Sequence, residues 1–329
     1  MDYDAGVEEL SEKDQKGEAT AVARICRRAP RQFYWPTFFL PPRQKHAAQS
    51  LLAFFVIASE AINADTSSPA SPSSCGCGSN TTQLLRDRID VVYSNNFALP
   101  LPEFRDENQH VLSALAQTVN AFEIPQLHFH TWLDGLCAER ATRRYATWSS
   151  LARHCDATAG SLAQTASCVL GVTRSDARQQ MLAFGRGLKL SQILRELAVS
   201  RALNKIDLPL EDLIRFRVLE KDVLQGTWSS NFDSLLQHEI ERAADELDNA
   251  QQLIPWLAGD GSRIAASMVL AHARADLQTL SRSSSTLLKA PVARTFPFSL
   301  RTVATVWRLS RVTPCAPTTS PSSPSSDTL

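Results

Sequence analysis

Three pairs of residues have the types and the spacing that could bind a metal ion. They are Cys75 and Cys77, His128 and His130, and Glu241 and Asp245. The cysteine pair would need two more ligands at close spacing to bind zinc, and none follows it. On a helix, residues i and i+2 point to different faces, so the histidine pair does not suit a shared metal. The carboxylate pair lies in an acidic run that we interpret as the solvated face of an amphipathic helix.

Basic side chains that could bind a phosphate group gather near residues 186–201. Arg186 and Lys189 are three residues apart and therefore share a helix face. Lys189 could contact a phosphate as a point charge. We favour an ion pair with Glu196 or Glu60, because partly buried charges are usually paired. The sequence contains neither a Gly-rich phosphate loop nor a supported Ser-His-Asp or Cys-His motif.

Overall charge excludes one broad class of partner. The 329-residue chain has 34 basic and 34 acidic residues, whereas a nucleic-acid binder usually carries a clear basic excess. Seven scattered cysteines argue against a disulfide framework and favour a reducing compartment. Basic residues are nevertheless concentrated locally in two patches, the first at Arg24, Arg27, Arg28 and Arg31 and the second at Arg43 and Lys45.

Helical periodicity fills most of the chain and must position these side chains. Helices are predicted over residues 43–64, 83–94, 107–121, 125–141, 148–171, 174–200, 209–214, 220–225, 231–254, 260–280 and 297–309. Convincing alternating strands are absent, so we predict an all-α single domain with one core. That domain spans residues 23–290, with a Ser-rich loop insertion at 65–82 and a C-terminal extension at 291–312. Residues 1–22 and 313–329 are predicted to be disordered tails.

Targeting signals and membrane spans are not evident in the sequence. The acidic first residues do not resemble the basic start of a targeting segment. The most apolar run, residues 51–58, is about 8 residues long, against roughly 20 needed to cross a bilayer. We therefore expect no transmembrane segment and a cytoplasmic or peripheral membrane location. A mitochondrial location stays open, although no presequence is visible.

Motifs in a fixed order give the chain a resemblance to a known family. They read RQFYWPTFFLPPRQKHAAQSLLAFFVIASEAINA at 31–64, QLLRDRIDVVY at 83–93, LDGLCAERATRRYATWSSL at 133–151, HCDATAGSLAQTASCVLG at 154–171 and GRGLKLSQILRELAVSRALNKIDLPLEDL at 185–213. A pair of long helices is expected to follow at 231–280. Over about residues 24–290 the chain resembles the squalene/phytoene synthase family, the head-to-head prenyl synthases.

The resemblance implies a fold and a chemistry. The fold would be an isoprenoid-synthase-like helical bundle around a central apolar cavity. Family enzymes join two prenyl diphosphates, and two facing Asp-rich motifs bind the magnesium that grips the diphosphates. Loss of a diphosphate leaves an allylic carbocation, so it requires strong positive charge beside the leaving group. Magnesium prefers carboxylate oxygen and water, and carboxylates at i and i+4 of one helix can bind it together.

Both Asp-rich motifs are degraded in this chain. Where the family has Asp-Asp-x-x-Asp, residues 59–63 place Ser59 and Asn63 at the ends and keep a charge only at Glu60. Where the family has Asp-x-x-x-Asp, the ends are Glu196 and Ser200. The degraded positions are therefore Ser59, Asn63 and Ser200.

Nearby positions differ from the family pattern as well. Lys189 and Gln192 stand where the family usually has Gln and Asn, Asp207 replaces a Tyr, and Glu139 stands where Asp is common. Lys189 therefore introduces a positive charge close to the expected metal position.

Three functions are compatible with these observations. The first is a catalytically impaired or inactive family member that binds a prenyl lipid or a protein partner, with no cofactor. In its lost aspartates it resembles a complex I assembly factor of the same family. The alternative is an active Mg2+-dependent prenyl transferase, a transferase of squalene or phytoene type. In that enzyme Glu60, Glu139 and Glu196 would bind the metal, and Arg186, Lys189 and Arg195 would bind the diphosphate of prenyl diphosphate substrates. The third is a helical scaffold whose cavity is filled by side chains.

Overall fold

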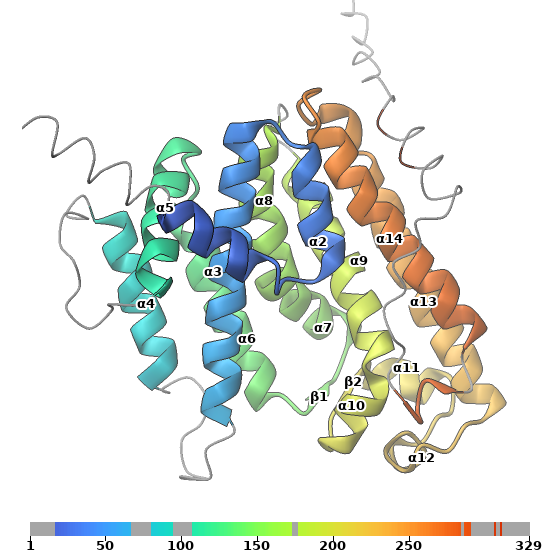
Figure 1. Ribbon diagram of the computed structural model, residues 1–329. Coiled ribbons are helices and arrows are strands. Elements are labelled where there is room, and N and C mark those ends of the chain that lie inside the picture. Colours follow the sequence, from blue (N-terminus) through green and yellow to red (C-terminus); the bar gives the residue numbers. More distant parts are fainter. Residues whose placement is uncertain are drawn as a thin grey trace, which may run out of the picture.

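The computed structural model describes residues 17–66, 80–94, 107–172, 177–283 and 286–290, together with Val306 and Ser310. These residues form a helical bundle (Figure 1). Its helices are α2 (Arg31–Tyr34), η1 (Trp35–Phe39), α3 (Pro42–Thr66), α4 (Asn80–Tyr93), α5 (Glu107–Ala121), α6 (Gln126–Ala141), α7 (Trp148–Cys155), η3 (Asp156–Gly160), α8 (Ser161–Leu170), α9 (Arg178–Arg195), α10 (Leu197–Ala202), α11 (Leu210–Arg215), α12 (Glu220–Gln225), α13 (Ser230–Gln251), η4 (Ile254–Trp256) and α14 (Ser262–Arg282). The predicted all-α class is confirmed.

Two predicted long helices are interrupted in the structure. The helix expected over 148–171 contains a wide π turn, η3, between α7 and α8. The helix expected over 174–200 ends at Arg195, because Glu196 leaves helical geometry with φ −99° and ψ 11° before α10 begins. Beside the π turn two backbones touch, since a Cβ on Gly185 would lie 2.4 Å from the backbone nitrogen of Gly160. Such contacts between distant residues leave no mark on local periodicity.

The structure also contains a short pair of parallel strands that the sequence did not predict. Strand β1 (Arg144–Tyr145) pairs with β2 (Ile206–Pro209), and the pair joins the end of α6 to the segment after α10. Strands this short cannot display an alternating pattern.

The N-terminal tail is shorter than predicted. Residues 17–26 are helical, and Ala21 and Val22 are buried against the bundle. The predicted loop at 65–82 is also too long at both ends, because α3 ends with residues 65 and 66 and α4 begins with residues 80–82. Residues 67–79, most of the extension at 291–312 with its predicted helix, and the tail at 313–329 lie outside the described residues.

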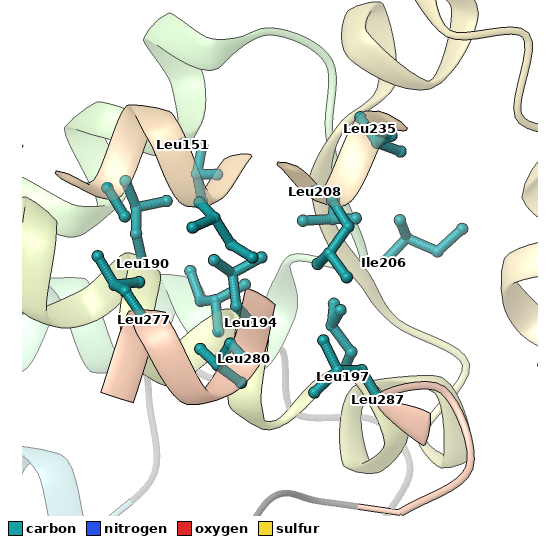
Figure 2. Packing of buried hydrophobic residues seen from close by; sticks show 14 of the residues in the cluster. Leu151, Leu190, Leu194, Leu197, Ile206, Leu208, Leu235, Leu277, Leu280 and Leu287 are labelled. Atoms are coloured by element: carbon teal, nitrogen blue, oxygen red, sulfur yellow. The ribbon is translucent and has the colours of Figure 1, made fainter. Parts of the chain in front are cut away.

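The described core is divided, in contrast to the single core predicted. One apolar cluster joins α7, α9, β2, α13 and α14, and some of its leucines are labelled with Ile206 in Figure 2. A second cluster joins the helix at 17–26 to α3, α4, α5 and α6. Gly187 lets α13 approach α9 closely, since a Cβ there would lie 2.7 Å from Cγ of Leu247. This packing fixes the orientation of α9 and of its polar side chains.

Helix α3 is long and apolar enough, by length and composition alone, to cross a membrane. The stretch is Pro42–Ala64, with a mean hydropathy of 1.4. In the structure α3 packs against α4, α5 and α8, and Ala53, Phe54 and Ala58 are fully buried. Burial in the bundle accounts for part of this apolar composition, since 39% of the most apolar part of the helix is buried.

Candidate functional site

The elements that carry the predicted site residues reach the same end of the bundle. In Figure 1 the C-terminal ends of α3 and α6 and the junction of α9 with α10 all lie at the lower end of the molecule. The contact between Glu139 on α6 and Lys189 on α9 ties two of these elements together.

The first degraded motif retains one carboxylate, and that carboxylate has a cationic partner. Glu60 forms an ion pair with Arg28, which follows the helix at 17–26. Both side chains are about half exposed, at 54% for Glu60 and 47% for Arg28. Ser59 is partly buried and Asn63 is exposed one turn further along α3. Within residues 59–63, Glu60 is the one acidic residue, and an arginine already offsets its charge.

Glu139 is the best-enclosed of the candidate carboxylates. Lys189 donates to its Oε1 at 2.7 Å, and the lysine side chain is only 9% exposed. Lys205 donates to the backbone oxygen of Glu139 at 2.8 Å. His154 Nε2 lies 3.8 Å from the same Oε1, a distance for electrostatic attraction rather than a direct hydrogen bond.

The electrostatics of Glu139 follow from these contacts. Burial by itself opposes its ionisation, but His154 and Lys189 outweigh burial and hold the pKa of Glu139 well below its usual range. Glu139 is therefore a carboxylate at any physiological pH, with the Lys189 ammonium as its counter-ion.

Arg186 has two carboxylate partners on the neighbouring elements. Its Nε and Nη2 donate to the two oxygens of Asp156 at 2.7 and 2.9 Å, in the bidentate geometry that suits a guanidinium. Its Nη1 lies 3.5 Å from Glu246 Oε1 on α13. The hydrogen bonds to Asp156 in particular raise the pKa of Arg186.

The residues in and beside the second degraded motif also form ion pairs and hydrogen bonds within the protein. Arg195 Nη1 donates to Asp276 Oδ2 at 2.9 Å, and both side chains are buried. Glu196 is 41% exposed, with Arg195 Nη2 4.0 Å away and the Gln192 amide donating to it at 3.2 Å. Ser200 donates to Asp207 at 2.5 Å.

The structure decides how the predicted site residues pair. The partners expected for Lys189 were wrong, because it bonds Glu139 rather than Glu196 or Glu60. Arg186 and Arg195 pair with Asp156 and Asp276, which the sequence reasoning missed. These partners lie 30 and 81 residues from their arginines, so no spacing rule could have indicated them.

The donor set of this region does not fit a magnesium ion. Magnesium needs several hard oxygen ligands in near-octahedral geometry, usually including carboxylates. Glu60 and Glu139 instead face cations of the protein, and Glu196 has an amide and an arginine as neighbours. Within the part of the chain that the structure describes, no group of three or more His, Cys, Asp or Glu side chains could hold a metal.

Comparisons with known proteins all point to one family. The family model described as squalene/phytoene synthase matches residues 26–307. The 15-cis-phytoene synthase of Synechocystis sp. is 25% identical over 252 residues, which cover 72% of this chain and 70% of that protein. The chloroplastic phytoene synthase of Narcissus pseudonarcissus is 21% identical, and the match covers 71% of this chain and 53% of that one.

Solved structures share the fold at lower sequence identity. A dehydrosqualene synthase in complex with a ligand superposes with a TM-score of 0.71 at 19% identity, covering 91% of this chain and 96% of that one. The squalene synthase HpnC from Alicyclobacillus acidocaldarius gives a TM-score of 0.67 at 16% identity, covering 84% and 96%. The likeness therefore extends over nearly the whole of both solved chains.

Proposed function

Because this chain belongs to the squalene/phytoene synthase family, we propose that it has kept the fold of a prenyl synthase but acts by binding rather than by catalysis. One observation carries the proposal. Two of the three candidate metal-binding carboxylates, Glu60 and Glu139, are each paired with a cation of the protein itself, Arg28 and Lys189.

The chemistry of diphosphate departure explains why this pairing matters. A leaving diphosphate needs a concentrated positive charge beside it, which a bound metal supplies in metal-assisted reactions. Lys189 contributes one positive charge, but Glu139 cancels it at 2.7 Å. A neutral ion pair attracts a distant anion far less than a free ammonium does. Ionisation of an allylic diphosphate at this site therefore lacks its driving charge.

The same charge balance indicates the class of ligand. Asp156 and Glu246 offset Arg186, and Asp276 offsets Arg195. A diphosphate would have to displace these partners, whereas an uncharged prenyl chain would not. We therefore favour an apolar prenyl lipid as the ligand, with a protein partner as the other outcome of a binding screen.

A product assay tests the proposal. The folded full chain is incubated with farnesyl or geranylgeranyl diphosphate, magnesium and NADPH, and diphosphate release and extracted hydrocarbons are followed. An active family enzyme assayed in parallel serves as the positive control. We expect no turnover, and a thermal shift with geranylgeraniol that magnesium does not enhance.

A specific result would overturn the proposal in favour of the alternative function. Relatives named phytoene synthases at 25% identity support an active prenyl transferase. Turnover that disappears with a chelator and in Glu196→Ala would establish it. The metal would then bind to Glu60, Glu139 and Glu196. This would require the ion pairs of Arg28 with Glu60 and of Lys189 with Glu139 to break.

A further inference from the structure

Three exposed aromatic side chains lie together near the N-terminus. Trp35, Phe38 and Phe39 are 44%, 45% and 48% exposed. The ring centroids of Trp35 and Phe38 are 5.7 Å apart, and Tyr34 packs edge-on against Phe38 at 5.2 Å. Lys45 Nζ lies 4.4 Å from the Phe38 ring centroid. We call these three exposed rings, with the two basic patches found in the sequence, the aromatic-basic face.

The rings are held outward by a turn that is anchored underneath. Thr37 is buried, donates to the Tyr34 carbonyl at 2.7 Å and accepts from Gln49 at 3.2 Å. The Phe39 carbonyl abuts Gly261, where φ is +107° and an added Cβ would lie 2.0 Å from the oxygen. In Figure 1 the helix at 17–26 crosses the front of the bundle, and α2, which leads into this turn, lies beside α14. Exposure of the rings is thus imposed by a packed turn.

The chain segment that carries the rings has charged residues of one sign only. From residue 19 to residue 59 the sequence contains no Asp or Glu, and it holds the six basic residues of the two patches. Among acids on neighbouring elements, Glu60 pairs with Arg28. Asp260 accepts from Ser262 beside the Phe39 turn, and Glu123 follows Phe122, whose ring lies under Arg43. A net positive charge remains over the aromatic-basic face.

We propose that the aromatic-basic face docks on the surface of a bilayer that contains anionic lipids. Aromatic rings settle at the level of the headgroups, and Lys and Arg attract anionic headgroups within a Debye length. Binding at the interface strengthens with the apolar area buried and with the electrostatic attraction to anionic lipids. A net positive charge suits a lipid surface, which presents many identical anions without requiring a matched partner. This proposal does not depend on whether the chain is catalytic.

Vesicle flotation with the full chain tests the proposal. Vesicles of phosphatidylcholine alone are compared with vesicles that also contain phosphatidylserine, at low and high salt. We expect binding that requires phosphatidylserine and falls with salt. Arg27→Gln with Arg31→Gln should weaken binding about 25-fold, from about fivefold per basic residue. Trp35→Ala with Phe39→Ala should have a similar effect of about 25-fold, because each ring has roughly half its surface left to bury.

Another exposed tryptophan, far from these rings in the sequence, provides a matched control. Trp228, between α12 and α13, is also 44% exposed, so Trp228→Ala removes an equally exposed ring from a different surface. It should leave vesicle binding unchanged, and circular dichroism should show all variants folded.

Several outcomes would overturn the proposal. Equal binding to both kinds of vesicle would remove the role of charge, and loss of binding in Trp228→Ala would move the surface elsewhere. Absence of binding by the full chain would also refute it. If the full chain does not bind vesicles, the other candidate occupant of the aromatic-basic face is the acidic segment at residues 1–16, which has six carboxylates and two lysines.

Discussion

Replacing Lys189 with methionine tests the central ion pair of the candidate site. The substitution keeps most of the side-chain volume and removes the ammonium that lies 2.7 Å from Glu139. Breaking a buried pair by removing one partner typically costs about 3–5 kcal/mol. Glu139 retains 31% side-chain exposure, so water relieves part of this penalty and we expect about 2–3 kcal/mol. For a domain of this size, the melting temperature should fall by about 4–6 °C.

The effect should depend on pH with a definite sign. The pKa of Glu139 is lowered in the folded state, so its stabilising contribution is present above the ordinary value of 4.5 and is lost as pH falls through the lowered pKa. In Lys189→Met the carboxylate loses its counter-ion and takes up a proton more readily. The difference in stability between the two proteins should therefore shrink from neutral to acidic pH.

Urea unfolding followed by circular dichroism, at pH 7 and pH 4, measures both effects. Arg28→Gln is the control, because it breaks the exposed pair with Glu60 and should cost no more than about 1 kcal/mol. The double variant Lys189→Met with Glu139→Leu should recover part of the lost stability. A Lys189→Met protein as stable as the unmodified chain at pH 7 would refute the buried pair. A double variant whose loss of stability equals the sum of the losses in the two single variants would also refute the buried pair.

Two further predictions concern stability away from the site. Gly185→Ala should cost about 3 kcal/mol, because the new Cβ would meet the Gly160 backbone, while Gly259→Ala, with nothing within 4 Å, should be neutral in the same urea titration. Burial raises the pKa of Glu239 to about 7, and the nearby Asp212 carboxylate adds to this effect, although contacts with Arg242 oppose it. The contribution of Glu239 to folding stability is therefore present below pH 4.5 and is lost as pH rises through 7. Glu239→Gln should remove that slope, at most about 1.4 kcal/mol per pH unit; an unchanged pH profile of the urea midpoint would contradict the assignment.

Local patterns in the sequence predicted the helices well where neighbours along the chain decide the structure. Helix 107–121 was predicted with the bounds that the structure shows, because Val111, Leu115 and Val119 repeat on one face and are buried. The helix break at Glu196 was missed, as was the π turn beside Gly185. A contact between backbones 25 residues apart has no local signature.

The candidate site was predictable in its residues but not in its connections. Motif comparison identified Glu139 and Lys189 as positions of interest, and the structure brings them together across 50 residues of sequence. Electrostatic preference alone could not choose among Glu60, Glu139 and Glu196 as the partner of Lys189. The choice depends on how α6 and α9 each pack on the π turn η3 and on α8, which a one-dimensional pattern does not contain.

The polar contacts at this end of the bundle also oppose substitutions that would restore the family's residues at positions 189 and 200. Returning residue 189 to glutamine leaves Glu139 enclosed without a counter-charge. Returning Ser200 to aspartate places a second carboxylate beside Asp207, where Ser200 now donates a hydrogen bond at 2.5 Å. Each single step backward lowers stability before any metal could bind. A variant designed to bind magnesium at this end of the bundle would therefore need at least two substitutions made together.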